Sequence, residues 1–157
     1  MTPLLALALL IAGPDYTTST GAVFSAVSHP AMGDAWRAPD GKVWARLALA
    51  LNYVNEGQVS DGRITDSPAT KACEELGARL PSHAEYQALM AFFSSGTQDG
   101  RNDFDLLFPN SGQVTFWTAS ALPPLSYANR ARTFETEYWG VGSWAVTPLS
   151  LSVRCVL

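Results

Sequence analysis

The chain is poor in the residues that build metal centres and hydrolytic sites. Among its 157 residues there are only two cysteines and two histidines. A structural zinc site needs several ligands at short spacings, and a Ser-His-Asp triad needs a histidine beside a positioned nucleophile. Cys73 and Cys155 lie far apart, and neither His29 nor His83 accompanies a Gly-x-Ser-x-Gly turn. We therefore expect no metal, no cofactor and no catalytic activity.

Charge is scarce as well. Charged residues make up 15% of the chain, and the formal net charge is -4. No run of lysine or arginine supplies the phosphate-neutralising surface that nucleic-acid binding requires. We expect no nucleic-acid partner.

The apolar run near the N-terminus is too short to cross a membrane. Leu4–Ala12 contains no polar residue, but as a helix it would extend only about 14 Å, under half of the hydrocarbon core. Small residues follow it, as at the end of a secretory signal, although no lysine or arginine precedes it. Residues 1–13 are therefore predicted to be a signal-like segment. The alternative is an apolar segment that stays on the protein and packs against itself or sister chains.

The two cysteines are better explained by a disulfide than by metal binding. A bridge that closes so long a loop would stabilise the fold by roughly 4 kcal/mol in the chain-entropy model. Export leads to oxidising compartments, where disulfides persist. The sequence thus predicts a Cys73–Cys155 bridge and a secreted or cell-surface protein, with the periplasm as an alternative location. Two buried, reduced cysteines in a cytosolic protein remain the other interpretation.

One α+β domain is expected over residues 34–157, after a linker or irregular strand at 14–33. Ser67 and Pro68 predict the start of one helix, and Gly77 its end. Ser82 with Glu85 forms the pattern of a capping box for a second helix. A loop is predicted from Gly96 to Gly112. A hairpin at Asp40–Gly41 and alternating or β-branched runs predict strands, the clearest at 114–120, 130–135 and 149–156.

Four short motifs resemble those of one family, in the same order along the chain. They are Gly41-Lys42-Val43-Trp44, Arg79-Leu80-Pro81-Ser82-His83-Ala84-Glu85-Tyr86, Phe116-Trp117-Thr118-Ala119-Ser120 and Val153-Arg154-Cys155-Val156. This order resembles the Lcl C-terminal-domain-like family of bacterial adhesin domains over roughly residues 40–157. The resemblance implies a C-type-lectin-like fold, in which two helices pack on a small, mostly antiparallel sheet. Related adhesin domains are trimeric.

The motifs also have local interpretations, most of them structural. Arg79 is expected to be an internal hydrogen-bonding anchor, while Trp44 and Trp117 are expected to fill the core. His83, at the start of a capped helix, is expected to be exposed. The carboxylates of 99–105 lack the spacing of an EF-hand loop, so a solvated loop is favoured over a calcium site. Formylglycine-generating enzymes share the fold and the 79–86 pattern, but their reactive cysteine pair is absent.

The predicted ligand surface lies between residues 125 and 145. Aromatic rings beside glycine, asparagine and arginine suit sugar stacking or a protein interface. The residues expected to contact a ligand are Tyr127, Asn129, Arg130, Tyr138 and Trp139; Trp144 is expected to belong to the core. The sequence therefore predicts a non-catalytic adhesin module that binds a glycan or cell-surface polymer. The alternative is a structural tip or oligomerisation module, with the aromatic patch as the interface of a homotrimer.

Overall fold

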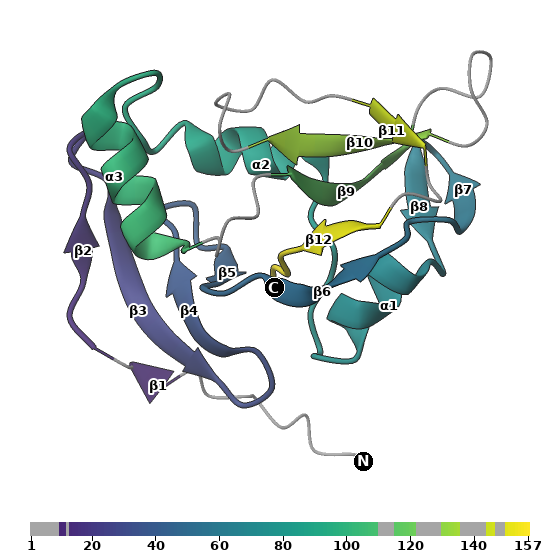
Figure 1. Cartoon of the computed structure of the whole chain (residues 1–157). Coiled ribbons are helices and arrows are strands. Elements are labelled where there is room, and N and C mark those ends of the chain that lie inside the picture. Colours follow the sequence, from purple (N-terminus) through teal and green to yellow (C-terminus); the bar gives the residue numbers. More distant parts are fainter. Residues whose placement is uncertain (1–9, 12, 110–114, 122–129, 136–143, 147–149) are drawn as a thin grey trace.

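The computed structural model has an α+β fold with two small sheets (Figure 1). It describes residues 10–11, 13–109, 115–121, 130–135, 144–146 and 150–157. Three helices and two sheets are present in these ranges. The predicted α+β class is confirmed, and the structure adds a third helix and a second sheet to the expected architecture.

The N-terminal sheet is antiparallel throughout. Its order is β1 (Leu10–Ile11), β3 (Val23–His29), β4 (Gly33–Arg37) and β5 (Val43–Ala45), with β2 (Tyr16–Thr17) also paired to β3. The predicted hairpin at Asp40–Gly41 joins β4 to β5 and places Trp36 opposite Trp44. Gly41 has a φ of 86°, which its missing side chain makes inexpensive.

The second sheet contains the strands predicted in the C-terminal half. Its order is β11 (Trp144–Val146), β10 (Arg130–Glu135), β9 (Thr115–Ala121), β12 (Leu151–Val153) and β6 (Leu49–Tyr53). The hairpin of β7 (Gln58–Ser60) and β8 (Arg63–Thr65) joins it through β9. The β12–β9 pairing is parallel, so the chain end runs through the middle of this sheet.

The two predicted helices are confirmed with their caps. In α1 (Pro68–Glu74) the Ser67 hydroxyl accepts from the Thr70 N–H at 3.0 Å. In α2 (His83–Met90) the Ser82 hydroxyl accepts from the Glu85 N–H at 3.1 Å, and the Glu85 carboxylate accepts from the Ser82 N–H at 2.8 Å. Each cap satisfies N–H groups that have no partner within the helix.

The predicted loop at 96–112 is wrong, because most of it forms α3 (Gln98–Leu107). Thr97 caps this helix by accepting from the Gly100 N–H at 3.0 Å. Phe104 and Leu107 are buried in the main aromatic cluster. This tertiary packing stabilises the helix, although its acidic, glycine-containing sequence does not indicate one.

The segment expected to be a linker or irregular strand, residues 14–33, contains β2 and β3. Phe24 of β3 is fully buried within the main aromatic cluster. The Tyr16 hydroxyl donates to the Asp103 carboxylate at 2.6 Å, and the Ser19 N–H donates to its other oxygen at 2.7 Å. These contacts attach the N-terminal strands to α3, which lies beside them in Figure 1.

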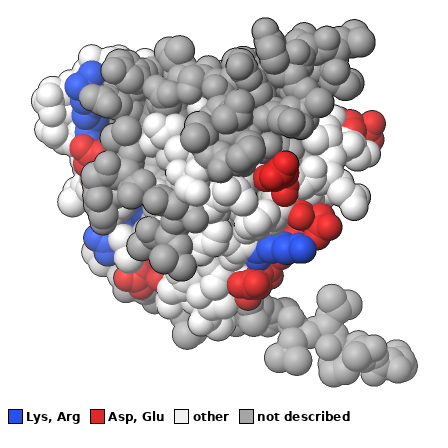
Figure 2. Space-filling model, turned by 45° about the vertical axis from the view of Figure 1, so that its right-hand side comes forward, with Lys and Arg blue, Asp and Glu red and all other residues white. Residues whose placement is uncertain are grey.

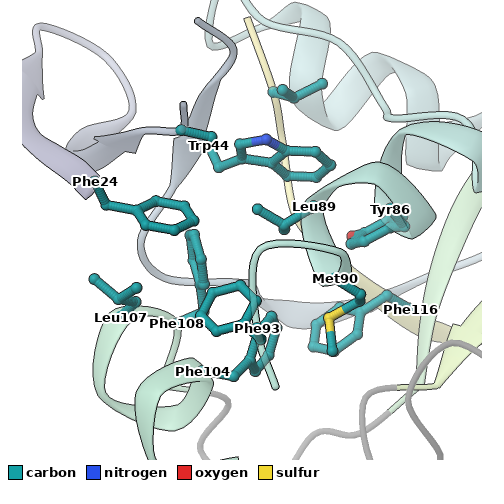
Figure 3. Close-up of a cluster of buried hydrophobic side chains, with 12 residues drawn as sticks. Phe24, Trp44, Tyr86, Leu89, Met90, Phe93, Phe104, Leu107, Phe108 and Phe116 are labelled. Atoms are coloured by element: carbon teal, nitrogen blue, oxygen red, sulfur yellow. The ribbon is translucent and has the colours of Figure 1, made fainter. Parts of the chain in front are cut away.

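The core consists of two main clusters. The first gathers aromatic rings from β3, β5, α2, α3 and β9, together with Leu89, Met90 and Leu107 (Figure 3). Trp44 and Tyr86 pack at one end of this cluster with ring centroids 5.1 Å apart. The second contains Trp117 and surrounds the bridge between α1 and the C-terminal segment. Both tryptophans are thus core residues, as predicted.

The disulfide is present. Cys73 of α1 and Cys155 are bonded, with their Cα atoms 5.4 Å apart and both side chains buried. The bridge ties the chain end to the first helix across 82 residues of sequence.

We predict that replacing both cysteines, Cys73→Ala with Cys155→Ala, lowers the free energy of unfolding by about 4 kcal/mol, because the unfolded chain regains the freedom that the closed loop removes. Urea denaturation of the oxidised protein would measure this. Reductant should bring the wild type close to the double variant and leave that variant unchanged. A double variant as stable as the oxidised wild type would contradict the prediction.

A second prediction concerns Asp103. Burial raises the pKa of its carboxyl, but the hydrogen bonds from the Ser19 N–H and Tyr16 hydroxyl outweigh burial and leave the pKa below the ordinary 3.8. A lowered folded-state pKa gives stability that is present above the ordinary value and lost as the pH falls through the lowered one. Asp103→Asn should therefore cost about 1 to 2 kcal/mol at pH 7 and clearly less at pH 3.

Urea denaturation at a series of pH values measures this difference. Asp105→Asn is the matched control, because Asp105 lies on the same helix and is exposed. Equal losses at pH 3 and pH 7 for Asp103→Asn would show that its charge does not stabilise the fold.

Candidate functional site

The predicted ligand surface falls largely outside the described residues. Tyr127, Asn129, Tyr138 and Trp139 are not described, and Arg130 is described only as the first backbone position of β10. The described flanks are informative: β10 is antiparallel to β9 and β11, with Ala131 beside Ala121. The connection to Arg130 therefore joins β10 at one end, and the connection after Glu135 leaves at the other, about 17 Å away along the strand.

A groove lies on the N-terminal sheet, lined entirely by described residues. It is open and has a volume of about 780 Å³. We call it the Arg37 groove; its lining is Thr20, Gly21, Ala22, Val23, Ser25, Arg37, Ala38, Pro39, Ala91 and Phe92. One wall comes from β3, another from the end of β4, and the third from the segment that follows α2. The groove thus combines two hydroxyls, one guanidinium and one aromatic ring on an otherwise small, apolar lining.

Local contacts hold this groove in shape. The Thr18 and Thr20 hydroxyls donate to the Phe92 carbonyl at 3.2 and 2.7 Å, which satisfies a backbone acceptor just beyond the end of α2. The Phe92 ring packs edge-on against Phe24, with ring centroids 6.0 Å apart. The wall formed by Phe92 is therefore anchored in the aromatic core.

Charge in the groove comes from Arg37. The ion pairs of the described residues join Lys42 with Asp40, Arg46 with Asp34, Lys71 with Asp66 and Arg79 with Glu85. Figure 2 shows lysine and arginine side chains of the described surface lying near acidic ones on the face in view. Arg37 is exposed, and within the described part of the chain no carboxylate pairs with it. It therefore remains available to an acidic ligand.

Residues that sequence reasoning weighed for chemistry have structural roles here. The Nδ1 atom of buried His29 accepts from the Ala31 and Met32 N–H groups at 3.2 and 3.0 Å, which fixes the β3–β4 turn. His83, expected to be exposed, is buried at 4% exposure, and its own N–H donates to the Ser120 hydroxyl at 3.0 Å. The start of α2 packs against β9 through this backbone bond, so this end of the helix is buried and not exposed.

Arg79 is the internal anchor that the sequence predicts. Its guanidinium makes two hydrogen bonds to the Glu85 carboxylate, at 2.7 and 2.6 Å. Burial raises the pKa of Glu85, but the bonds from Arg79 and the Ser82 N–H outweigh it and leave that pKa below its ordinary value. The pair therefore stays charged at neutral pH and holds the entry of α2.

The part of the chain that the structure describes contains no group of three or more histidine, cysteine or acidic residues placed to hold a metal ion. Within 99–105, Asp103 turns inward to Tyr16 and Ser19, so it does not converge with the exposed acids of α3. Oxygen ligands for calcium must converge on one point.

Sequence reasoning missed the groove. Arg37 belongs to no recognised motif, and Thr20 and Val23 lie in the segment expected to be a linker or irregular strand. The available signal was Pro39, which cannot donate to a ladder and so ends β4 beside a strand that continues.

The chain matches no family model, no curated protein and no solved structure in the three comparisons made. In the described ranges, no helix has the length and apolar character needed to cross a membrane.

We predict that calcium does not stabilise this protein. The midpoint of thermal unfolding should stay within about one degree when millimolar Ca²⁺ replaces chelator, because Asp103 is bonded inward and Asp99 and Asp105 lie on different sides of α3. Differential scanning calorimetry with magnesium as the control cation measures this. A calcium-specific rise of several degrees would overturn the prediction.

Proposed function

We propose that this chain is a non-catalytic recognition module that acts in an oxidising compartment, with a glycan or cell-surface polymer as its ligand. The four adhesin-type motifs and the resemblance to C-type-lectin-like domains motivate the ligand class. The proposed contact residues are Tyr127, Asn129, Arg130, Tyr138 and Trp139, which lie on or next to the two connections that meet opposite ends of β10. Secretion or display at the cell surface is part of the proposal.

The observation that carries the proposal is the rigid frame to which these residues are attached. The two connections that bear Tyr127, Asn129, Tyr138 and Trp139 begin and end on β9, β10 and β11 of one sheet, and Arg130 begins β10. In β9, Phe116 and Trp117 are fully buried, and the Trp117 indole donates to the Tyr53 carbonyl at 2.6 Å. Binding residues commonly lie on connections held by such a scaffold.

The disulfide supports the proposal that the protein acts in an oxidising compartment. Its two cysteines are buried and bonded in the fold, and bonds of this kind persist where thiols are not kept reduced. The same bond braces α1 against the chain end, next to the β9–β12 pairing. The Cys73–Cys155 disulfide thus supports both the proposed oxidising compartment and the rigidity of the frame.

Trp139→Ala is predicted to abolish glycan or polymer binding and to shift the thermal midpoint by no more than about 2 °C, because a stacking ring must keep one face open to water. A glycan array followed by calorimetry on the hits measures both effects. Trp117→Phe is the contrasting variant: it removes a buried indole donor, so stability should fall while Trp139 is untouched. If Trp139→Ala instead unfolds the protein, Trp139 belongs to the core and the site assignment fails.

Light scattering on the same sample separates the alternative function. Glycan binding by a monomer supports the recognition module. A stable trimer with a blank array would favour the structural tip or oligomerisation module and overturn the proposal.

A further inference from the structure

The Arg37 groove contains an open strand edge, which follows from hydrogen-bond alternation along β3. Thr18 and Ala22 form a hydrogen-bonded pair, since the Thr18 N–H donates to the Ala22 carbonyl at 2.9 Å. Bonded and non-bonded pairs alternate in an antiparallel ladder. Counting on, Tyr16 and Phe24 are bonded, while Thr17 and Val23 are not. The N–H and C=O of Val23 therefore point away from β2, toward the side on which β4 runs.

The next ladder gives the same phase. The Ala38 N–H donates to the Lys42 carbonyl at 2.8 Å, so Arg37 directs its backbone groups away from β5 and toward β3. Ser25 and Arg37 are thus the last bonded pair between β3 and β4. Continuing the same register by two residues, to the next position for a bonded pair, would place Pro39 opposite Val23.

Pro39 cannot make that pairing. It has no N–H, and the chain turns there, with the Gly41 N–H donating to the Ala38 carbonyl at 2.9 Å. Among the described residues, no backbone or side-chain group outside the ladders bonds to the Val23 N–H or C=O. The groove therefore exposes one donor and one acceptor with strand spacing, next to a half-exposed Val23 side chain at 45% exposure.

The remaining lining selects what fits this edge. A peptide in extended form offers a complementary N–H and C=O, and its alternate side chains would face the apolar residues of the groove. Arg37, one pair further along the ladder, has no partner among the described carboxylates. A guanidinium binds a carboxylate through paired, charge-assisted hydrogen bonds. The open edge and the cation thus favour an acidic peptide.

We propose that the Arg37 groove is a second binding site, which receives an extended segment of a partner protein. The segment pairs its backbone with Val23 and places an aspartate or glutamate side chain on Arg37. This site lies on the N-terminal sheet and goes beyond the proposed glycan surface, which is attached to β9, β10 and β11.

The test uses the full-length oxidised chain and an array of acetylated, amidated nonapeptides. Each peptide has random apolar and threonine flanks around a central aspartate or glutamate, and a matched set has asparagine or glutamine there. Acidic peptides should bind, and Arg37→Gln should weaken them by about tenfold or more, the effect of losing one charge-assisted contact. Arg101→Gln, an exposed arginine of α3 outside the groove, is the matched control and should change nothing.

Backbone pairing needs its own readout. For the tightest acidic peptide, methylating one backbone nitrogen at a time should abolish binding at the nitrogen that donates to Val23 and leave its sequence neighbours little affected. Trp139→Ala should leave peptide binding unchanged, which separates this site from the proposed glycan surface.

Four outcomes would overturn the peptide site. They are no preference for acidic over neutral peptides, binding that survives Arg37→Gln, the same tolerance to methylation at every position, and no peptide binding at all. Acidic sugars that bind wild type and lose binding in Arg37→Gln, without peptide hits, would make the groove a glycan site and leave the proposed function standing. Blank peptide and glycan arrays would overturn both.

Discussion

The fold depends on one buried cation at its centre. Arg154 is 1% exposed, and its guanidinium donates to the carbonyls of Ala45 and Arg46 and, at 3.5 Å, to that of Phe108. It also lies over the Phe108 and Phe116 rings, 5.2 and 5.4 Å from their centroids. Burial lowers the pKa of Arg154 to about 10, so the group is still charged at neutral pH. A buried charge is stable only where dipoles and rings replace water. Truncating Arg154 would leave buried carbonyls without a donor, at a cost of about 1 to 3 kcal/mol each. The last residues of the chain therefore organise the β5–β6 connection and the end of α3 at once.

The chain end that carries Arg154 also holds the two sheets together. Val156 forms bridges to both Trp44 and Arg79, and the Ala45 N–H donates to the Cys155 carbonyl at 2.9 Å. Figure 1 shows the chain end between the N-terminal sheet and the second sheet. The disulfide and the Arg154 contacts involve neighbouring residues of this segment. The disulfide fixes the segment covalently to α1, and the Arg154 guanidinium bonds it to the carbonyl at the end of β5. These contacts join residues that are far apart in sequence, so forming them carries a cost in loop-closure entropy.

Local chemistry was enough to predict some elements and not others. Ser67 and Ser82 act through hydrogen bonds within three residues, so their helices could be identified from sequence. The cysteine pairing followed from the lack of competing partners. By contrast, α3 depends on Phe104 and Leu107 entering a cluster built by distant segments, and its Gly100 is required because a side chain there would overlap the Ser94 carbonyl. Neither cause is visible in a window of sequence. For the Val23 edge, Pro39 was visible in the sequence, but the β3–β4 register that brings it toward Val23 was not. The five residues predicted for the aromatic patch stay a prediction.

The N-terminal sheet carries the Arg37 groove. Its strands β1 to β4 lie before the four motifs singled out in the sequence, and only β5 contains part of one of them. The sheet shares the aromatic core through Phe24 and attaches to α3 through Asp103. The Arg37 groove is built from these strands and from the end of α2, whose other end is held by the Arg79–Glu85 pair. An extended ligand at Val23 would continue a sheet already packed on the core, so binding would require little rearrangement of the frame. The Thr18 and Thr20 hydroxyls bond to the Phe92 carbonyl, and the Phe92 ring packs on Phe24. The groove is therefore attached directly to the aromatic cluster. Ligand affinity at this groove and stability of the N-terminal strands are consequently linked, since a ligand that binds only the folded state stabilises it.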